Sequence, residues 1–318
     1  MQTRRKEPGL SALTFELIPV PPFSLEYTAW ALRRRSENLV DRWEDSKYQR
    51  VLMLEGQPAE IHVSQQGGLK TPRLEVTVLS KRPGSRVKPA ISRTLRGMLG
   101  LDADLTPFYR LAERDAKLRP LAERYRGLKP VRFPTVFEAL ANAIACQQFT
   151  LVAGLRLLGE VVQRGSVWLR TRNGIHYGFP QPADFLRLPA HTFRCIGFSH
   201  QKTLAFRTLC RSLLKGQVDL EALNAMDNDA AMNFLLQLHG IGRWSAEYAL
   251  LRGLGRLDVF PADDVGARKS LAKWLHLRRP WDYDRVLRTL RPWQPYGGFI
   301  YFHMLLESLR TAGKLTSE

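Results

Sequence analysis

Residues 238–253, LHGIGRWSAEYALLRG, decide the fold of this chain. Two glycines, Gly240 and Gly242, flank one isoleucine, Ile241, and a run with helical spacing follows them. Because glycine has no Cβ, the backbone can turn tightly here and can approach another surface closely. We therefore expect Ile241 to anchor a tight turn in the core, directly before a helix.

The pattern around these glycines is typical of a helix-hairpin-helix, which holds the backbone of DNA without reading its sequence. The second helix should begin at Arg243 or Trp244, where its free N–H groups and positive dipole end suit a phosphate oxygen. An ordinary connector between two helices is the alternative, and the glycines alone would favour it. The segment that distinguishes the two follows at 252–264, RGLGRLDVFPADD.

Two aspartates, Asp263 and Asp264, stand where the next helix should begin. An aspartate there usually caps the helix, and for Asp263 we prefer that interpretation. For Asp264 the dipole of the same helix would also stabilise an ionised carboxylate. Trp244 and Tyr248 are four residues apart and so share one helix face. Such a pair lies in the core of most helices, and a binding pocket is the competing interpretation.

The composition favours a globular protein with a polyanionic partner. The chain has 318 residues, 44% of them hydrophobic and 25% charged, and a formal net charge of +18. This surplus favours nucleic acid first and an anionic membrane surface second. Without an apolar run of membrane-spanning length or a signal peptide, we expect a cytoplasmic protein. The three cysteines, Cys146, Cys195 and Cys210, lack the spacing of a disulfide framework or a metal site.

The hydrophobic pattern predicts a mixed domain at 1–104. Four apolar runs separated by turn signals predict antiparallel strands, and two runs with helical spacing predict helices. The strands are expected at 13–20, 48–56, 59–68 and 73–80, and the helices at 24–39 and 87–101. The basic stretch 81–96 fits either a phosphate-facing segment or a solvated helix start.

From residue 105 to 318 the pattern predicts an all-helical domain, because apolar residues recur three and four apart between Gly or Pro breaks. The helical segments are expected at 106–125, 133–148, 151–165, 201–216, 230–238, 243–253, 263–275 and 299–310. A small hairpin insertion is expected near 166–180, around Asn173-Gly174. The expected fold class is an α+β domain, an antiparallel sheet with two helices, followed by an all-α helix-hairpin-helix domain.

The segment 238–264 resembles the glycine-rich hairpin and downstream aspartate of the helix-hairpin-helix DNA glycosylases, and among them the 3-methyladenine DNA glycosylase II (AlkA) type. Segments 133–150, 193–210 and 291–305 are also similar to this family, and the N-terminal part is similar less specifically. The resemblance covers nearly the whole chain. Departures from the family's usual residues, which leave base preference open, lie at Cys146, Gln294, Gly297 and Gly298.

The resemblance implies a DNA glycosylase of base excision repair that rotates a damaged nucleotide out of the duplex and hydrolyses its N-glycosidic bond. Asp264 would stabilise the cationic sugar or activate the attacking water, two roles that the sequence does not separate. An aromatic pocket would favour alkylated purines, chiefly 3-methyladenine, because these bases are cationic. The pocket residues so implied are Trp244, Tyr248, Tyr296, Phe302 and Asp263.

Lyase-competent relatives carry a lysine where this chain has Trp244, so we expect a monofunctional enzyme that leaves an intact abasic site. Two other functions share the motifs: a glycosylase for deaminated or oxidised bases, and a non-catalytic damage-sensing DNA-binding protein. Asp264 behind the aromatic helix favours an enzyme, since a protein that only binds DNA has no need of it.

The expected partner is double-stranded DNA with damaged bases, bound by a monomer without a cofactor. For the DNA contacts we expect a wedge loop and the hairpin, at Gln148, Phe149, His239, Gly240, Ile241, Gly242 and Arg243. A core position at the end of its helix is an equal alternative for Phe149. The resemblance alone also implies a structural Na⁺ or K⁺ at the hairpin, held by the carbonyls of Leu238, Gly240 and Gly242.

Overall fold

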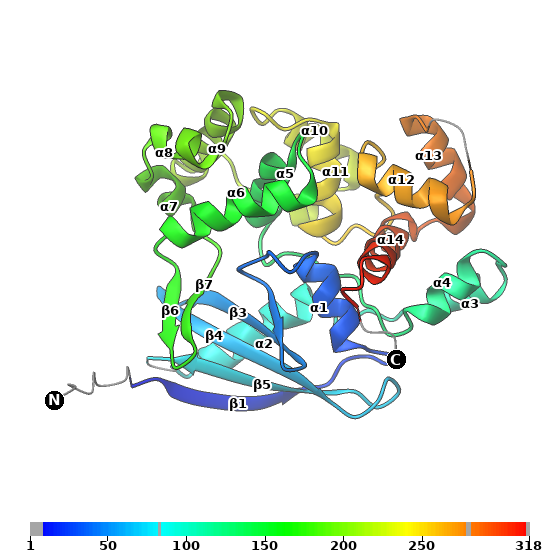
Figure 1. The fold of residues 1–318 in the computed structure, drawn as a ribbon, viewed down its shortest axis with the longest axis horizontal. Coiled ribbons are helices and arrows are strands. Elements are labelled where there is room, and N and C mark those ends of the chain that lie inside the picture. Colours follow the sequence, from blue (N-terminus) through cyan, green and yellow to red (C-terminus); the bar gives the residue numbers. More distant parts are fainter. Residues whose placement is uncertain (1–8, 82–83, 278–280, 316–318) are drawn as a thin grey trace.

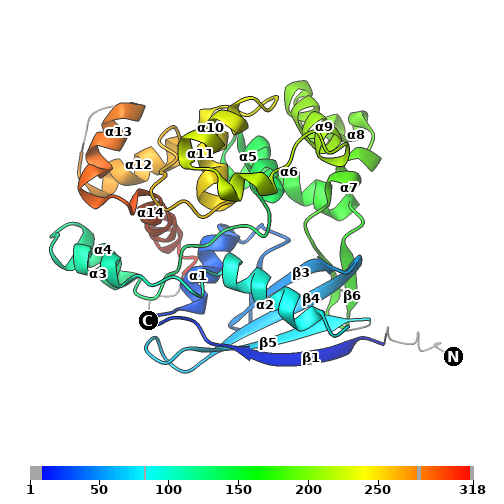
Figure 2. The same cartoon turned by 180° about the vertical axis from the view of Figure 1, so that it is seen from behind.

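The computed structural model describes residues 9–81, 84–277 and 281–315. Figures 1 and 2 show a sheet at one end of the molecule and a group of helices at the other, with α1 between the two parts. The expected fold class is confirmed, since an antiparallel sheet with two helices precedes an all-helical region.

The N-terminal part is a five-stranded antiparallel sheet with the strand order β1-β5-β4-β3-β2. Its strands are β1 (Ser11–Leu17), β2 (Arg42–Glu44), β3 (Lys47–Leu54), β4 (Gln57–Gln66) and β5 (Arg73–Ser80), and its helices are α1 (Leu25–Arg33) and α2 (Val87–Met98). The four predicted strands and both helices are confirmed. Strand β2 escapes prediction because three residues are too few to show an alternating pattern.

Helix α1 begins at a side-chain cap and ends at an unusual backbone conformation. The Ser24 hydroxyl accepts a hydrogen bond from the backbone N–H of Tyr27 at 3.3 Å, which satisfies one free donor of the first turn. The helix ends at Arg34, whose φ is +67°. Figure 2 shows α2 against one face of the sheet, while α1 lies toward the helical part. This arrangement brings the end of α1 to the helical domain.

The helical part carries every predicted helix. Its elements are α3 (Thr106–Glu113), α4 (Leu118–Arg124), α5 (Val136–Cys146), α6 (Leu151–Arg164), α7 (Pro182–Arg187), α8 (Ala190–Ile196), α9 (His200–Leu214), α10 (Asn228–Leu236), α11 (Arg243–Arg252), α12 (Val265–Trp274), α13 (Tyr283–Leu290) and α14 (Gly297–Thr311), with 3₁₀ turns at Glu221–Ala225 (η1) and Arg291–Trp293 (η2). Segment 106–125 divides into two helices because the Asp115 carboxylate accepts from the N–H groups of Lys117 and Leu118 and starts α4. Helices α7, α8 and α13 were not predicted.

Helix α5 is the central helix of this part. Almost all of its residues are buried, including the small residues of ALANAIA at 139–145. It packs against α6, α9 and α11. A helix that is apolar on all sides belongs in the interior, and alanines allow neighbouring helices to approach closely. Helix α5 therefore fixes the positions of the elements that surround the candidate site.

The predicted hairpin insertion is confirmed, as β6 (Trp168–Thr171) and β7 (Gly174–Tyr177). It packs on the N-terminal sheet, where Gly178 forms a parallel bridge with Val51 of β3. Beside this bridge, Nδ1 of His176 lies 2.5 Å from Oε1 of Glu60, a buried residue of β4. The hairpin therefore fastens the helical domain to the sheet.

Candidate functional site

The segment between α10 and α11 forms the predicted tight hairpin, and its two glycines have different roles. Gly240 has φ +80°, and a Cβ there would lie 2.5 Å from the Cβ of Ala205 on α9, so both the turn and the packing require glycine. Ile241 is buried in the main core, as predicted. Gly242 caps α11, is exposed, and has open space where a Cβ would stand. Packing within the protein therefore does not require a glycine at position 242. Close approach of another molecule to this exposed backbone would require it.

A cleft of about 1140 Å³ lies next to this hairpin. Its walls come from the loop between α5 and α6, from α11 and α12, and from α14. Small-molecule sites usually enclose about 300–1,000 Å³, so the cleft has room for a nucleotide. The predicted site residues that line it are Gln148, Phe149, Gly242, Arg243, Trp244, Tyr248, Asp263 and Asp264.

Asp264 lies at the N-terminus of α12, and its carboxylate is held at the wall of the cleft. Oδ1 accepts a hydrogen bond from the backbone N–H of Ala267 at 2.8 Å. Oδ2 lies 3.3 Å from Nε1 of Trp244 and 3.3 Å from the hydroxyl of Tyr301, both of which donate to it. Because Asp264 is the cap of this helix, the prediction that Asp263 caps it is wrong.

Asp263 forms ion pairs instead. Its Oδ2 lies 2.6 Å from Nε of Arg243 at the start of α11, and its Oδ1 pairs with Arg268 of α12. The guanidinium of Arg243 also stacks 3.8 Å from the ring centre of Tyr283. Asp263 lines the cleft as predicted, and its contacts show it joining the hairpin helix to the helix that carries Asp264.

Trp244 and Tyr248 form an aromatic wall. Their ring centres are 5.6 Å apart with the planes inclined by 35°. Trp244 is half-buried, while Tyr248 is buried and reaches the cleft at its inner end. Of the two interpretations, a core pair or a pocket pair, the pocket is therefore correct for Trp244. Tyr248 belongs to both the core and the cleft wall.

Two predicted pocket residues, Tyr296 and Phe302, lie elsewhere. Tyr296 precedes α14 and packs its ring 5.3 Å from that of Phe108, and Phe302 is fully buried in the core. The residues of α14 that line the cleft are Tyr301, Met304, Leu305 and Ser308. They are spaced three and four apart on one helix face, so the next residue after Tyr301 points about 100° away. The prediction is therefore wrong for both residues, and Tyr301 occupies the expected place.

The loop after α5 carries the two predicted wedge residues at the mouth of the cleft. Gln148 has φ +56° and is exposed. Phe149 is 44% exposed, so the alternative that it belongs to the core is wrong. Nζ of the buried Lys202 lies 3.6 Å from the Phe149 ring centre and donates to the carbonyl of Ala145 at 3.0 Å. An exposed phenyl ring held by a cation is well suited to stack on a base.

Sequence reasoning missed Gln147, which ties the wedge loop to the hairpin. Its side-chain amide donates to the carbonyl of Gly240 at 2.8 Å and to the hydroxyl of Ser245 at 3.0 Å. The Leu238 carbonyl accepts from the backbone N–H of Ile241. Each carbonyl keeps a second lone pair, which fits a cation ligand, and the Na⁺ or K⁺ site stays a prediction. His239 is exposed, as expected for a residue on the hairpin surface.

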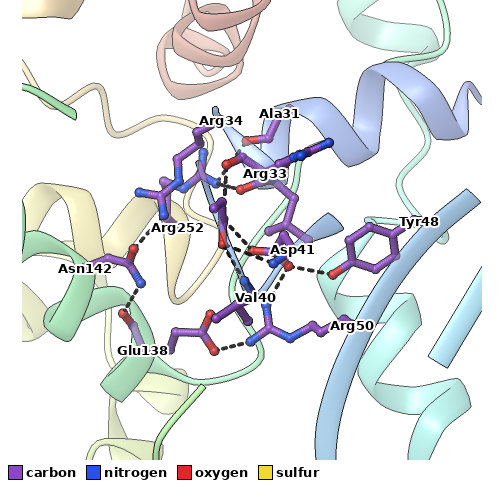
Figure 3. Close-up of polar contacts among 12 residues, drawn as sticks. Ala31, Arg33, Arg34, Val40, Asp41, Tyr48, Arg50, Glu138, Asn142 and Arg252 are labelled. Atoms are coloured by element: carbon purple, nitrogen blue, oxygen red, sulfur yellow. Dashed lines mark hydrogen bonds and ion pairs between the residues drawn. The ribbon is translucent and has the colours of Figure 1, made fainter. Parts of the chain in front are cut away.

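Sequence reasoning also missed Arg34, which reaches the cleft from the N-terminal domain. Its guanidinium donates to the Tyr248 hydroxyl at 2.9 Å and to Oδ1 of Asn142 at 2.6 Å. Figure 3 shows it beside a buried ionic group in which Arg50 of β3 joins Asp41 to Glu138 of α5. Nothing in the local sequence distinguishes Arg34 from its neighbours, because its partners are distant in the chain.

The basic stretch 81–96 lies apart from the cleft. Its described part belongs to α2 and the turn before it, and contributes none of the described cleft-lining residues. Arg96 pairs with Asp102. The geometry favours the interpretation of this stretch as a solvated basic helix.

The buried side chain of Glu247 on α11 holds the backbone just before Asp264 in place. Its Oε1 accepts from the Tyr283 hydroxyl at 2.6 Å and its Oε2 from the backbone N–H of Ala262 at 3.2 Å. Burial raises the pKa of Glu247 from an ordinary value of 4.5 to about 7. The folded protein therefore binds this proton more tightly than the unfolded chain does.

From this pKa we expect stability to fall as pH rises. The contribution of Glu247 is fully present below pH 4.5 and is lost as pH rises through about 7. The variant Glu247→Gln, which cannot titrate, should flatten this dependence. Urea unfolding at pH 5.0 and pH 7.5 gives the free energy of unfolding at each pH. If this free energy changed equally between the two pH values in the variant and in the wild type, Glu247 would not be the group that titrates.

No group of three or more His, Cys, Asp or Glu side chains in the described residues is arranged to hold a metal ion. Within the same residues, no helix has the length and apolar character needed to span a membrane.

Two protein families match consecutive parts of the chain. The AlkA N-terminal domain matches residues 14–138, and the HhH-GPD superfamily of base excision DNA repair proteins matches residues 141–295. The second match contains the hairpin, Trp244 and Asp264 in the geometry described above. The chain belongs to the HhH-GPD superfamily. Membership places it among DNA glycosylases. The first match continues through α3 and α4, and the boundary at residue 104 stays a prediction.

Several known proteins are similar to this chain in sequence or in fold. The DNA-3-methyladenine glycosylase of Bacillus subtilis is 29% identical over 204 residues, which are 64% of this chain and 67% of that protein. The structure of a 3-methyladenine DNA glycosylase from Archaeoglobus fulgidus superposes with a TM-score of 0.81 at 24% identity, and the match covers 95% of this chain and 100% of that one. An 8-oxoguanine glycosylase/lyase of Clostridium acetobutylicum in complex with double-stranded DNA gives a TM-score of 0.71 at 14% identity, covering 95% and 98%. The two structural matches establish the fold.

Proposed function

We propose that the protein is a monofunctional DNA glycosylase that excises alkylated purines, chiefly 3-methyladenine, from double-stranded DNA. The observation that carries the proposal is the Asp264 carboxylate, held by Ala267, Trp244 and Tyr301 at the wall of a cleft large enough for a nucleotide. The name of the Bacillus subtilis relative supports the same substrate class. The protein would act as a monomer and without a cofactor.

The chemistry follows from the position of Asp264. As the N-glycosidic bond breaks, its electron pair goes to the base and positive charge develops on the sugar. Asp264 lies where it can stabilise that charge, and water then adds to C1′ to leave an abasic site. The Tyr301 hydroxyl remains a donor to Asp264, because burial and the nearby carboxylate raise the pKa of Tyr301 well above 10.0.

The aromatic wall supplies a reason to prefer alkylated bases. A purine alkylated at a ring nitrogen is cationic, and a cation over an aromatic face gains up to about 2 kcal/mol when desolvated. The half-buried ring of Trp244 offers such a face inside the cleft. A cationic base is also a better leaving group, so a single carboxylate suffices as the catalytic charge.

The surroundings of the cleft are suited to a bent, opened duplex. Phe149 and Gln148 are exposed at its mouth and would fill the gap that the everted nucleotide leaves. The first N–H groups of α11, behind the exposed Gly242, would bind a phosphate on the same strand. Gln147 holds these two elements together.

Absence of lyase activity is proposed because Trp244 takes the place of the amine that a Schiff base requires. Lys269 also lines the cleft, so the question needs a direct measurement. Borohydride treatment of a reaction in progress would trap a covalent enzyme–DNA complex if an amine attacked C1′. We expect no trapped complex.

The test of the function is incubation of the purified protein with methylated duplex DNA, followed by chromatography of the released bases. We expect 3-methyladenine as the main product and abasic sites that break only after alkaline treatment. Release of no methylated base, with retained DNA binding, would instead support a damage-sensing protein.

A further inference from the structure

The wall of the cleft includes Arg34, a residue from the N-terminal domain. Arg34 follows the last residue of α1, is 3% exposed, and lines the cleft. Its φ of +67° is unfavourable for a residue with a side chain, so the surrounding contacts hold it in place. One of these contacts is the hydrogen bond from its backbone N–H to the carbonyl of Trp30, at 2.8 Å.

The guanidinium of Arg34 is fixed by two hydrogen bonds. Nη2 donates to Oδ1 of Asn142 at 2.6 Å, and the Asn142 amide donates in turn to the carbonyl of Glu138 at 2.9 Å, which fixes the amide's orientation (Figure 3). Nη1 donates to the Tyr248 hydroxyl at 2.9 Å. Nε of Arg34 is buried and has no hydrogen-bond partner among the described residues.

The contact with Arg34 determines how the Tyr248 hydroxyl can act. An arginine side chain only donates, so the tyrosine oxygen is the acceptor in this bond. The hydrogen of the Tyr248 hydroxyl has no acceptor within the described residues. Burial raises the pKa of Tyr248, which keeps this hydrogen in place. The hydroxyl can therefore donate to a molecule in the cleft.

We propose that Arg34 is a specificity-determining residue that adapts the cleft to neutral purines presenting a hydrogen-bond acceptor, such as a carbonyl oxygen, to Tyr248. The inference rests on the proposed function and assigns the side chains that set its preference among bases. Arg34 acts through Tyr248, and the buried guanidinium charge opposes entry of a cationic base at the same end of the cleft.

The reaction gives this arrangement a direct consequence. When the C1′–N bond of a neutral base breaks, the electron pair leaves negative charge on the base, water adds to C1′, and a proton from that water neutralises the base. A donor at the acceptor edge of the base stabilises the developing negative charge. A cationic base leaves as a neutral molecule, so it gains nothing from the same donor.

The experiment compares two duplex substrates, methylated DNA that releases 3-methyladenine and DNA with a single hypoxanthine, which is neutral and carries a carbonyl. For Arg34→Met and Tyr248→Phe we expect kcat/KM for hypoxanthine, relative to 3-methyladenine, to fall about tenfold, the size of one lost hydrogen bond. Arg34→Lys, which keeps the charge, should recover part of the ratio.

The matched control is Arg33→Met, at the last residue of α1 and next to Arg34 in the chain. Arg33 donates to the carbonyls of Trp43 and Ser36 outside the cleft, and the ratio should not change. A parallel loss on both substrates would mean that Arg34 is merely structural and would overturn the proposal. Should Arg34→Met fail to fold, Tyr248→Phe decides the matter alone.

The proposed function and this inference fail in different ways. Wild-type protein that releases 3-methyladenine but no hypoxanthine overturns the inference and leaves the function standing. Release of hypoxanthine alone, with kcat/KM for hypoxanthine itself lowered in both variants and unchanged in Arg33→Met, supports the inference and contradicts the preference for alkylated bases. Protein that releases neither base overturns both.

Discussion

The variant Asp264→Asn is expected to release alkylated bases about a thousandfold more slowly than wild type while binding DNA equally well. A unit charge about 4 Å from the cationic sugar, at an effective dielectric constant near 20, stabilises it by about 4 kcal/mol. That energy corresponds to about a thousandfold in rate. Asparagine retains a side-chain oxygen that can cap α12 at the N–H of Ala267, so the substitution removes the charge and leaves the helix start intact.

Single-turnover release of 3-methyladenine measures the rate, and fluorescence anisotropy with a duplex containing an abasic-site analogue measures the binding. The matched control is Asp227→Asn. Asp227 caps α10 in the same way, accepting from the N–H of Ala230 at 2.8 Å, and it lies outside the cleft. Equal losses in both variants would show that capping matters rather than charge. An undiminished rate in Asp264→Asn would exclude the carboxylate from the chemistry.

The parts of this site that the sequence predicts are those fixed by neighbouring residues. The hairpin follows from glycines on either side of Ile241, and the position of Asp264 follows from the helix that begins directly after it. Both depend on backbone preferences that act over a few residues. The prediction chose Asp263 as the cap where the structure has Asp264, and this shows the limit of such reasoning. Adjacent aspartates have equal capping propensity, and ion pairs of Asp263 with Arg243 and Arg268 decide between them.

Other parts depend on contacts that no local pattern records. Helix α14 is apolar on most of its surface, so the pattern does not show whether Tyr301 or Phe302 faces the cleft. One residue of difference rotates the side chain by about 100°. Arg34 and Tyr248 are separated by 214 positions, and only the folded chain brings them together. Strand β2 and helices α7 and α8 are too short to show a period.

The largest effect on stability is expected for Arg50→Met, which should reduce the free energy of unfolding by about 3–5 kcal/mol. Arg50 is 1% exposed and lies 2.7 Å from Oδ1 of Asp41 and 2.5 Å from Oε2 of Glu138. Its removal deprives two buried carboxylates of the cation that is ion-paired with them, and an unpaired buried charge costs more than the original pair contributed. Because β3 and α5 meet at this residue, the loss also weakens the contact between the two domains.

The pH dependence of this loss identifies its cause. Burial already raises the pKa of Glu138, and without Arg50 it should rise further, so the carboxyl takes up a proton more readily in the folded variant. The destabilisation should therefore be smaller at pH 5 than at pH 8, as urea unfolding at the two values would show. A loss independent of pH would point to the cavity left by the shorter side chain instead.

The control is the same substitution at an exposed pair, Arg164→Met. Arg164 lies 2.5 Å from Glu160 one helical turn away, and such surface pairs contribute about 0.3–0.5 kcal/mol. A second variant, Arg50→Met with Glu138→Leu, removes one of the two stranded carboxylates and should recover part of the stability. Recovery would show that the cost lies in unpaired charge, because an apolar pair of similar volume needs no counter-ion. Failure to recover would mean that the domain contact depends on the hydrogen bonds of this group rather than on its charge balance.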